Sequence, residues 1–196
     1  MMRLVCPTAA PLESDPPGRP APGGPVPPRT ADAMLRRNAP PPAPYAAVLA
    51  MPFGAFGVRT RDSALEELVF LPPCTALQTP TSPLAQLAAA QLAAWLNEPD
   101  YVFDLPLAPR GTAFQRRVWR AIATIPRGRP VTYGALAHEL GTAARAVGGA
   151  CGANPFPVVV PCHRVVSVAG MGGFAGATDG YLLDAKRWLL EFEARR

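Results

Sequence analysis

Proline is spread unevenly along the chain, and its distribution limits which residues can fold. Half of the 26 prolines lie in residues 1–44, in runs such as "DPPGRPAPGGPVPPR" and "APPPAP". Proline removes a backbone donor, and this segment has few apolar side chains, so burial cannot offset the entropy lost on ordering. Residues 1–44 are therefore predicted to be a disordered or polyproline-like tail. The rest of the 196-residue chain is long enough for one ordinary domain or two small ones.

Composition and charge narrow the class of protein. Hydrophobic residues make up 49% of the sequence, enough for a packed core, and no stretch is long and apolar enough to cross a membrane. No apolar signal segment opens the sequence, and the four cysteines show no CxxC pair, which favours a cytoplasmic protein with free thiols. The net charge of +5 suits a polyanionic partner such as nucleic acid, but the general arginine bias gives that argument modest weight.

Residues 45–108 are predicted to form a small α+β domain. "YAAVLAMPFGAFGVRT" and "ALEELVFLP" alternate apolar with small or polar residues, which indicates two strands joined by a turn at "RTRDS". In "SPLAQLAAAQLAAWLNEPD", Ser82 can cap a helix, Pro83 suits its first position, and Pro99 follows its end.

Residues 109–196 are predicted to be mainly helical. "GTAFQRRVWRAIATIP" has a capping residue at Thr112 and one apolar face. "YGALAHELG" and "AARAVGGACGAN" indicate two short helices joined by a glycine-containing turn, the outline of a helix-turn-helix. An apolar run, "VVVPCHRVV", follows and is predicted to be a strand. A glycine-rich loop and a last helix, "LLDAKRWLLEFEARR", complete the chain.

The predicted strand "VVVPCHRVV" contains the residues that point to chemistry. Cysteine usually packs as a small apolar side chain, so Cys162 alone is uninformative. His163 and Arg164 follow it, and burying three such groups costs free energy unless they are paired or used. A histidine can activate a thiol directly or through a water, and its other ring nitrogen then needs an acceptor, for which the last helix offers Glu191 and Glu193. The hypothesis is a Cys-His-acid relay, which requires a bend in the strand.

Several of these stretches resemble one family of DNA repair proteins. "NPFPVVVPCHRVV", with "AARAVGGACGAN" before it and "KRWLLEFE" after it, is similar to the methylated-DNA:protein-cysteine methyltransferases, also called O6-alkylguanine-DNA alkyltransferases. The resemblance runs from about Gly111 to the C-terminus and includes the Pro-Cys-His-Arg signature, and "MPFGAFGVRTRDSALEELVFLP" is a weaker likeness to the family's N-terminal hairpin. It implies an α+β protein: a small ribonuclease-H-like α/β domain, then a mainly helical domain with a helix-turn-helix.

The resemblance implies a single-turnover reaction that needs no metal or cofactor. Cys162 would accept the alkyl group of O6-alkylguanine irreversibly, His163 would act as the base through a water, and Glu193 would orient His163. Tyr133 would donate a proton to the leaving guanine, and Asn154 would tether the active-site segment to the helix-turn-helix. As structural alternatives, Tyr133 is a helix-start anchor and Asn154 a turn residue. O4-alkylthymine is left open as a second substrate.

The resemblance also implies how DNA is bound. The reacting atom lies inside the base stack, so the nucleotide must be flipped out, and Arg145 occupies the position of the side chain that fills the gap. Small residues beside it would let a monomer approach the minor groove of double-stranded DNA with little sequence specificity. The predicted DNA contacts are Arg145, Ala144, Gly148, Gly149 and Tyr133, and the predicted base-pocket residues are Val165, Phe174, Ala175 and Pro157.

The sequence also departs from the family pattern. The turn "ELGTAAR" is two residues shorter than the usual loop, and Phe174 stands where the family generally has tyrosine. Four net extra residues lie in "ATDGYLLDA", where Tyr181 could restore the missing hydroxyl. The zinc site of some relatives has no counterpart, because no histidine lies near Cys6 or Cys74.

Three other functions are weighed against alkyl transfer. A non-enzymatic sensor of alkylated DNA would replace the cysteine, so the presence of Cys162 argues against it. A cysteine hydrolase built on Cys162, His163 and Glu193 would leave the helix-turn-helix and Arg145 unexplained. A simple DNA-binding regulator would leave the cysteine relay unexplained.

Overall fold

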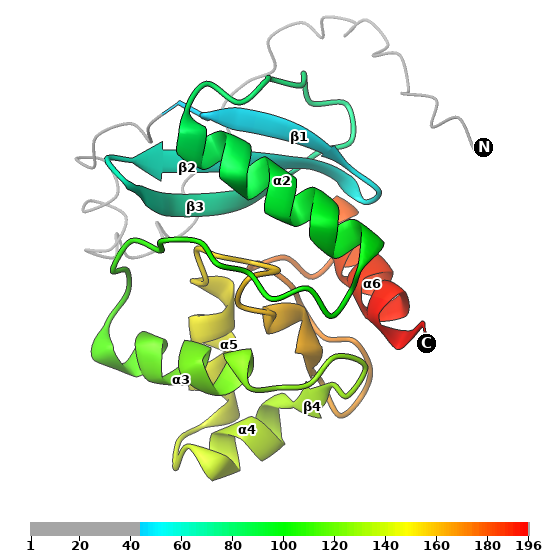
Figure 1. The fold of residues 1–196 in the computed structure, drawn as a ribbon. Helices are drawn as coiled ribbons and strands as arrows, with labels where there is room; N and C mark the ends of the chain where they lie inside the picture. The colour runs from blue at the N-terminus through cyan, green and yellow to red at the C-terminus, as the bar shows by residue number, and fades with distance from the viewer. Residues whose placement is uncertain (1–43, 196) are drawn as a thin grey trace, which may run out of the picture. The chain divides into compact units, whose positions relative to one another are not determined.

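The N-terminal part of the chain is an antiparallel sheet with a helix packed on it (Figure 1). The computed structural model describes residues 44–195, so the predicted tail lies outside the described residues except for Pro44. Helix α2 contacts all three strands of the sheet. These elements are β1 (Ala47–Met51), β2 (Gly54–Arg61), β3 (Ala64–Leu71) and α2 (Pro83–Asn97), with the strands in the order β1-β2-β3.

The first predicted strand is two strands in the structure. The predicted hairpin corresponds to β2 and β3, but "YAAVLAMPFGAFGVRT" turns back on itself at Pro52 and Phe53 to give β1 and β2. Proline cannot donate to a ladder, and Gly54 takes a positive φ of 135° that a side chain would oppose. A Cβ at Gly54 would also come within 2.9 Å of the Leu71 carbonyl oxygen, so glycine is required at this turn.

Helices dominate the C-terminal part, as predicted. Thr112 caps the first of them with a full capping box, in which its side chain accepts from the Gln115 amide and the Gln115 side chain accepts from the Thr112 amide. The helices are α3 (Ala113–Ala123), α4 (Tyr133–Glu139), α5 (Ala144–Gly152) and α6 (Tyr181–Ala194), and the two short strands β4 (Val131–Thr132) and β5 (Val165–Val166) pair in parallel.

The run "VVVPCHRVV" is not the predicted strand. Only β5 at its end is extended and paired, and Cys162–Arg164 form a single 3-10 turn, η1. Val158 has a φ of 74°, a left-handed conformation that is rare for a β-branched residue. The prediction of a strand is therefore wrong here. The relay of Cys162 and His163 required a bend in the chain, and the turn η1 is that bend.

Aromatic rings join the two parts of the described chain. Trp188 of α6 packs against Phe53, with ring centroids 5.3 Å apart, and Phe192 packs against Trp95 of α2 at 5.0 Å. Phe70 of β3 packs against Phe174 at 5.1 Å. The described residues form one compact unit, and the predicted division at 108/109 stays a prediction. Within residues 44–195 no helix is both long and apolar enough to cross a membrane.

Candidate active site

The thiol of Cys162 is buried at the start of η1. Only 4% of the residue is exposed, and its backbone amide donates to the Val160 carbonyl at 2.8 Å. Burial raises the pKa of the Cys162 thiol, while a hydrogen bond from Asn154 and the charge of Lys186 act in the opposite direction. The thiol is therefore protonated at neutral pH and needs a base before it can act as a nucleophile.

The neighbouring imidazole is completely buried and oriented by a carboxylate. Nε2 of His163 lies 2.8 Å from Oε1 of Glu193, and Nδ1 has no hydrogen-bond partner among the described residues. Burial lowers the pKa of His163 more than Glu193 raises it, so the ring is neutral at pH 7. A carboxylate acceptor places the ring proton on Nε2 and leaves the Nδ1 lone pair as the basic site.

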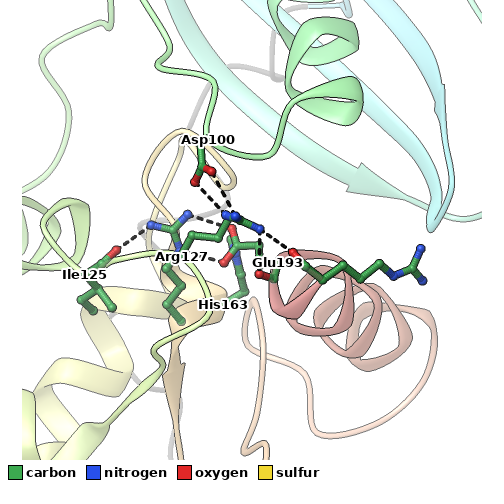
Figure 2. Close-up of polar contacts among 7 residues, drawn as sticks. Asp100, Ile125, Arg127, His163 and Glu193 are labelled. Atoms are coloured by element: carbon green, nitrogen blue, oxygen red, sulfur yellow. Dashed lines mark hydrogen bonds and ion pairs between the residues drawn. The ribbon is translucent and has the colours of Figure 1, made fainter.

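Glu193 is held as an anion by two neighbours (Figure 2). Nε and Nη2 of Arg164 donate to its two carboxylate oxygens at 2.9 and 2.8 Å, and Nη1 of Arg164 donates to the Ile125 carbonyl at 2.6 Å. Burial alone would raise the pKa of Glu193, but the hydrogen bonds from His163 and Arg164, together with the charge of Arg164, lower it to about 2. Of the two glutamates that the sequence offered, the structure places Glu193 at the imidazole.

Asn154 connects the end of α5 to the segment before the cysteine. Its side-chain amide donates to the Val160 carbonyl at 2.8 Å, and its carbonyl oxygen accepts from the Phe156 amide at 3.0 Å. The next residue, Pro155, accepts from the Leu68 amide of β3 at 2.8 Å. The contacts fit both the tether and the turn residue of the sequence analysis.

A pocket of about 290 Å³ opens beside Cys162. The predicted pocket residues Pro157, Phe174 and Ala175 line it, and the edge of β3 forms a wall that the sequence analysis missed. The other lining residues are Glu67, Leu68, Val69, Phe70, Cys151, Gly152, Asn154, Tyr181 and Leu182.

Val165, the fourth predicted pocket residue, is fully buried and is not among the residues that line the pocket. Its carbonyl accepts from Nζ of Lys186 at 2.8 Å, and the same ammonium donates to the carbonyls of Met171 and Gly173 at 2.7 and 3.0 Å. Burial lowers the pKa of Lys186 to about 8, and the nearby thiols oppose that shift. A carbonyl oxygen has two lone pairs, so Val165 can accept a second hydrogen bond.

Of the two tyrosines that the sequence analysis singled out, Tyr181 lines the pocket and Tyr133 does not. The Tyr133 hydroxyl donates to the Gly173 carbonyl at 3.3 Å, and burial raises its pKa to about 12, so the phenol keeps its proton. Tyr133 is not among the residues that line the pocket. Tyr181 does line it, beside Phe174, and its hydroxyl donates to the Phe70 carbonyl at 3.3 Å. Tyr181 and Phe174 thus line the same pocket, and the suggestion that Tyr181 replaces the missing hydroxyl stays a prediction.

One face of α5 is open. Ala144, Arg145 and Gly149 are exposed and Gly148 is half-buried, and a Cβ added at either glycine would meet nothing within 4 Å. The opposite face buries Val147, Ala150 and Cys151 against the core. The predicted DNA contacts on α5 therefore share one accessible helix face, and Tyr133 begins α4 on the other side of the turn.

Two cysteines line the pocket, and both are free thiols. Cys151 and Cys162 are buried and neither is in a disulfide, which agrees with the prediction of free thiols for these two residues. Between residues 44 and 195, no group of three or more His, Cys, Asp or Glu side chains is placed to hold a metal ion.

Comparison with known proteins identifies the family. The profile described as "6-O-methylguanine DNA methyltransferase, DNA binding domain" matches residues 113–195. A methylated-DNA–protein-cysteine methyltransferase of Methanosarcina acetivorans is 35% identical over 157 residues, which cover 76% of this chain and 97% of that protein. The chain belongs to the O6-methylguanine DNA methyltransferase family.

Other members of the O6-methylguanine DNA methyltransferase family match to different extents. A Mycolicibacterium paratuberculosis methyltransferase is 47% identical over 111 residues, which cover 55% of this chain and 64% of that protein, less than two thirds of its length. The Mycobacterium tuberculosis O6-methylguanine methyltransferase has a TM-score of 0.63 at 35% identity, over 75% of this chain and 90% of that one. The Mycobacterium tuberculosis OGT protein in complex with DNA has a TM-score of 0.61 at 36% identity, over 75% and 91%.

For this family member, the structure adds residues that the sequence analysis did not assign to the site. The sequence analysis gave Arg164 no role beyond being one of three adjacent groups that are costly to bury, but it binds the Glu193 carboxylate. Glu67 and Phe70 lie almost a hundred residues before Cys162, and no local pattern could have placed them at the pocket. The clustering of Pro, Arg and Gly in "IPRGRP" was the available signal for a constrained turn near the relay.

Proposed function

We propose that this chain is a single-turnover DNA repair protein that transfers the alkyl group of O6-alkylguanine irreversibly to Cys162. The observation that carries the proposal is a buried thiol at the edge of a pocket, followed directly by an imidazole paired with an ionised carboxylate. The methyltransferases of Methanosarcina acetivorans and Mycolicibacterium paratuberculosis named above support it.

The proposed reaction begins with a proton transfer. The Cys162 thiol gives its proton through a water to Nδ1 of His163, and the Glu193 anion stabilises the resulting imidazolium. The pKa of the Cys162 thiol is raised and the pKa of His163 is lowered, so a thiolate–imidazolium pair is not stable before substrate arrives. The thiolate therefore forms only as it attacks. General base catalysis of this kind contributes about 10²- to 10⁴-fold.

The bond-making step is an in-line displacement at carbon. The thiolate sulfur forms a bond to the alkyl carbon, and the bond between that carbon and guanine O6 breaks with its electron pair going to the base. Tyr133 supplies the proton that the leaving guanine takes up. The Tyr133 phenolate then regains a proton from solvent, and the His163 imidazolium releases its proton to solvent, so both groups return to their neutral forms. The products are an S-alkylcysteine and an unmodified guanine, and the thioether does not revert, so each molecule reacts once.

The pocket is proposed to receive the flipped base. Phe174 offers a ring face, Pro157 and Ala175 complete the lining, and the second lone pair of the Val165 carbonyl accepts from the guanine amino group. Asn154 holds the Val160 carbonyl and so fixes the segment that carries the thiol. The edge of β3 supplies Glu67, Leu68, Val69 and Phe70 to the pocket lining.

DNA is proposed to bind in its minor groove through α4 and α5, used as a helix-turn-helix. The open face of α5 lets the helix approach closely, and Arg145 fills the gap left by the flipped nucleotide. The Mycobacterium tuberculosis OGT complex with DNA supports this partner. The ribonuclease-H-like description of the N-terminal part, the monomeric state and the cytoplasmic location stay predictions.

The proposal is tested by incubating the full chain with a duplex that carries one O6-methylguanine and measuring the intact mass. We expect a gain of at most one methyl group per molecule, located on Cys162 by peptide mapping. Duplex binding without any gain in mass would instead indicate a sensor of alkylated DNA. Repeated turnover of an ester or peptide would indicate a hydrolase.

Arg145→Ala tests the flipping step separately. Extruding a nucleotide costs a few kcal/mol, so losing the side chain that fills the gap should slow duplex repair by roughly 10- to 100-fold. Reaction with free O6-benzylguanine, which needs no flipping, should change much less. Arg187→Ala, a loss of one exposed arginine on α6, is the charge-matched control. Equal losses on duplex and free base would reject the role of Arg145 in flipping.

A further inference from the structure

Arg127 connects the loop after α2 to the end of the helix that carries Glu193 (Figure 2). Nε and Nη2 of its guanidinium donate to the two carboxylate oxygens of Asp100 at 2.7 and 3.0 Å. Nη1 donates to the backbone carbonyls of Glu193 and Arg195 at 3.1 and 2.8 Å. Four donations from one side chain fix the guanidinium plane, since a bidentate pair with a carboxylate has a defined geometry.

The two carbonyls lie where a helix is least constrained. α6 ends at Ala194, and the last four carbonyls of a helix have no partner within it. A cation there satisfies those oxygens and opposes the negative end of the helix dipole. Glu193 is in this last turn, so any fraying of α6 moves its backbone and therefore its carboxylate.

The turn that carries Arg127 holds Glu193 from a second direction. Ile125, two residues earlier, accepts from Arg164, and Arg164 in turn binds the Glu193 carboxylate. Gly128 has a φ of 69°, and a Cβ there would lie 3.3 Å from the Glu193 carbonyl oxygen. The backbone of the turn thus passes close to the helix end, and the carboxylate and the carbonyl of one glutamate are both tied to it.

We infer that Arg127 is a positioning residue for alkyl transfer: it fixes the end of α6 so that the Glu193 carboxylate meets Nε2 of His163, and Asp100 orients its guanidinium. The inference rests on the proposed function. A purely stabilising role would be a small one. The Arg127 and Asp100 side chains are 24% and 68% exposed, and an ion pair this exposed adds little to the free energy of unfolding. Misplacing a catalytic group by about 1 Å, in contrast, can slow a reaction by roughly 10²-fold.

The main test is the variant Arg127→Met, which keeps the length of the side chain and removes its donors. Its first-order transfer rate at saturating O6-methylguanine duplex should fall roughly 10- to 100-fold. Its Kd for the duplex should stay the same, because the effect is on chemistry. Asp100→Asn keeps one oxygen that can accept from Arg127 and should reduce the transfer rate less than Arg127→Met does. Arg187→Ala removes the exposed partner of Asp184 on the same helix and should leave the rate unchanged.

A charge swap separates positioning from simple pairing. The double variant Asp100→Arg with Arg127→Asp restores opposite charges between the two segments but puts a carboxylate against the helix carbonyls. Because the exposed pair adds little to folding, we expect the thermal stability of the double variant to be similar to that of Arg127→Met, while the rate stays low. A restored rate would overturn the inference.

The other outcomes are also decisive. A weaker Kd for the duplex with an unchanged saturated rate would assign Arg127 to DNA binding and overturn the inference. If Arg127→Met does not fold, Asp100→Asn decides, since an unchanged rate in that variant contradicts the proposed role. Failure of the wild-type chain to gain a methyl group would reject the proposed function itself. That result differs from a failure of the inference, because it is obtained with Arg127 in place.

Discussion

Cys162→Ala should abolish alkyl transfer completely while the protein still binds duplex DNA. The removed sulfur is the bond-forming atom, and the pocket walls come from residues that the change leaves in place. Loss of one buried sulfur should change the free energy of unfolding by only about 1 kcal/mol. The measurements are the intact mass after incubation with an O6-methylguanine duplex, the Kd for that duplex, and an unfolding curve.

The second thiol of the pocket provides the matched comparison. Cys151 also lines the pocket, but burial raises its pKa to about 12, and no imidazole and carboxylate pair adjoins it in the part of the chain described. Cys151→Ala should therefore still gain one methyl group. A methyl group found on Cys151 in the Cys162→Ala variant would contradict the assignment of a single acceptor.

Glu193→Gln should slow alkyl transfer by roughly 10²- to 10³-fold, the larger part of what a general base supplies. The amide keeps the shape of the side chain but cannot stabilise an imidazolium at His163. It also leaves Arg164, whose side chain is 15% exposed, without its anion. Removing one partner of a buried ion pair typically destabilises a protein by about 3–5 kcal/mol. The saturated rate and the urea unfolding curve at pH 7 test both effects.

The same variant should change how stability depends on pH. The pKa of Glu193 is lowered from 4.5 to about 2, so its contribution is present above pH 4.5 and is lost as the pH falls toward 2. That shift corresponds to about 3 kcal/mol. His163, whose pKa is lowered from 6.5, resists protonation in the folded state and adds to the loss of stability below pH 6.5 in both proteins. The gap between wild type and Glu193→Gln should therefore narrow between pH 4.5 and 2, and a constant gap would contradict this account.

Local signals in the sequence predicted most of the helices. Thr112 has an oxygen that can reach the amide three residues later and is followed by Gln115, and both bonds are present. Ser82 followed by Pro83 marked the start of α2 in the same way. The strands were harder, because alternation in "YAAVLAMPFGAFGVRT" continues through Pro52, and only the pairing of β1 with β2 shows where the chain reverses.

The active-site segment shows how tertiary contacts override local preference. Valine-rich runs favour strands, yet Val158 is left-handed and Cys162 starts a 3-10 turn. The burial of His163 against Glu193 and the bond from Asn154 to Val160 determine this path. The relay itself was predictable from adjacent cysteine and histidine and from the family resemblance. The β3 wall and the Arg127 contacts were not, because they join segments far apart in the sequence.

The aromatic contacts across the molecule determine where the protein can be shortened. A version that began at residue 109 would keep η1 and the whole of α6 but would expose Trp188 and Phe192, which pack on Phe53 and Trp95. It would also lose the strand that walls the pocket. A shortened version for labelling or crystallisation must therefore keep the sheet and α2, although the residues that react all lie in the second half of the chain.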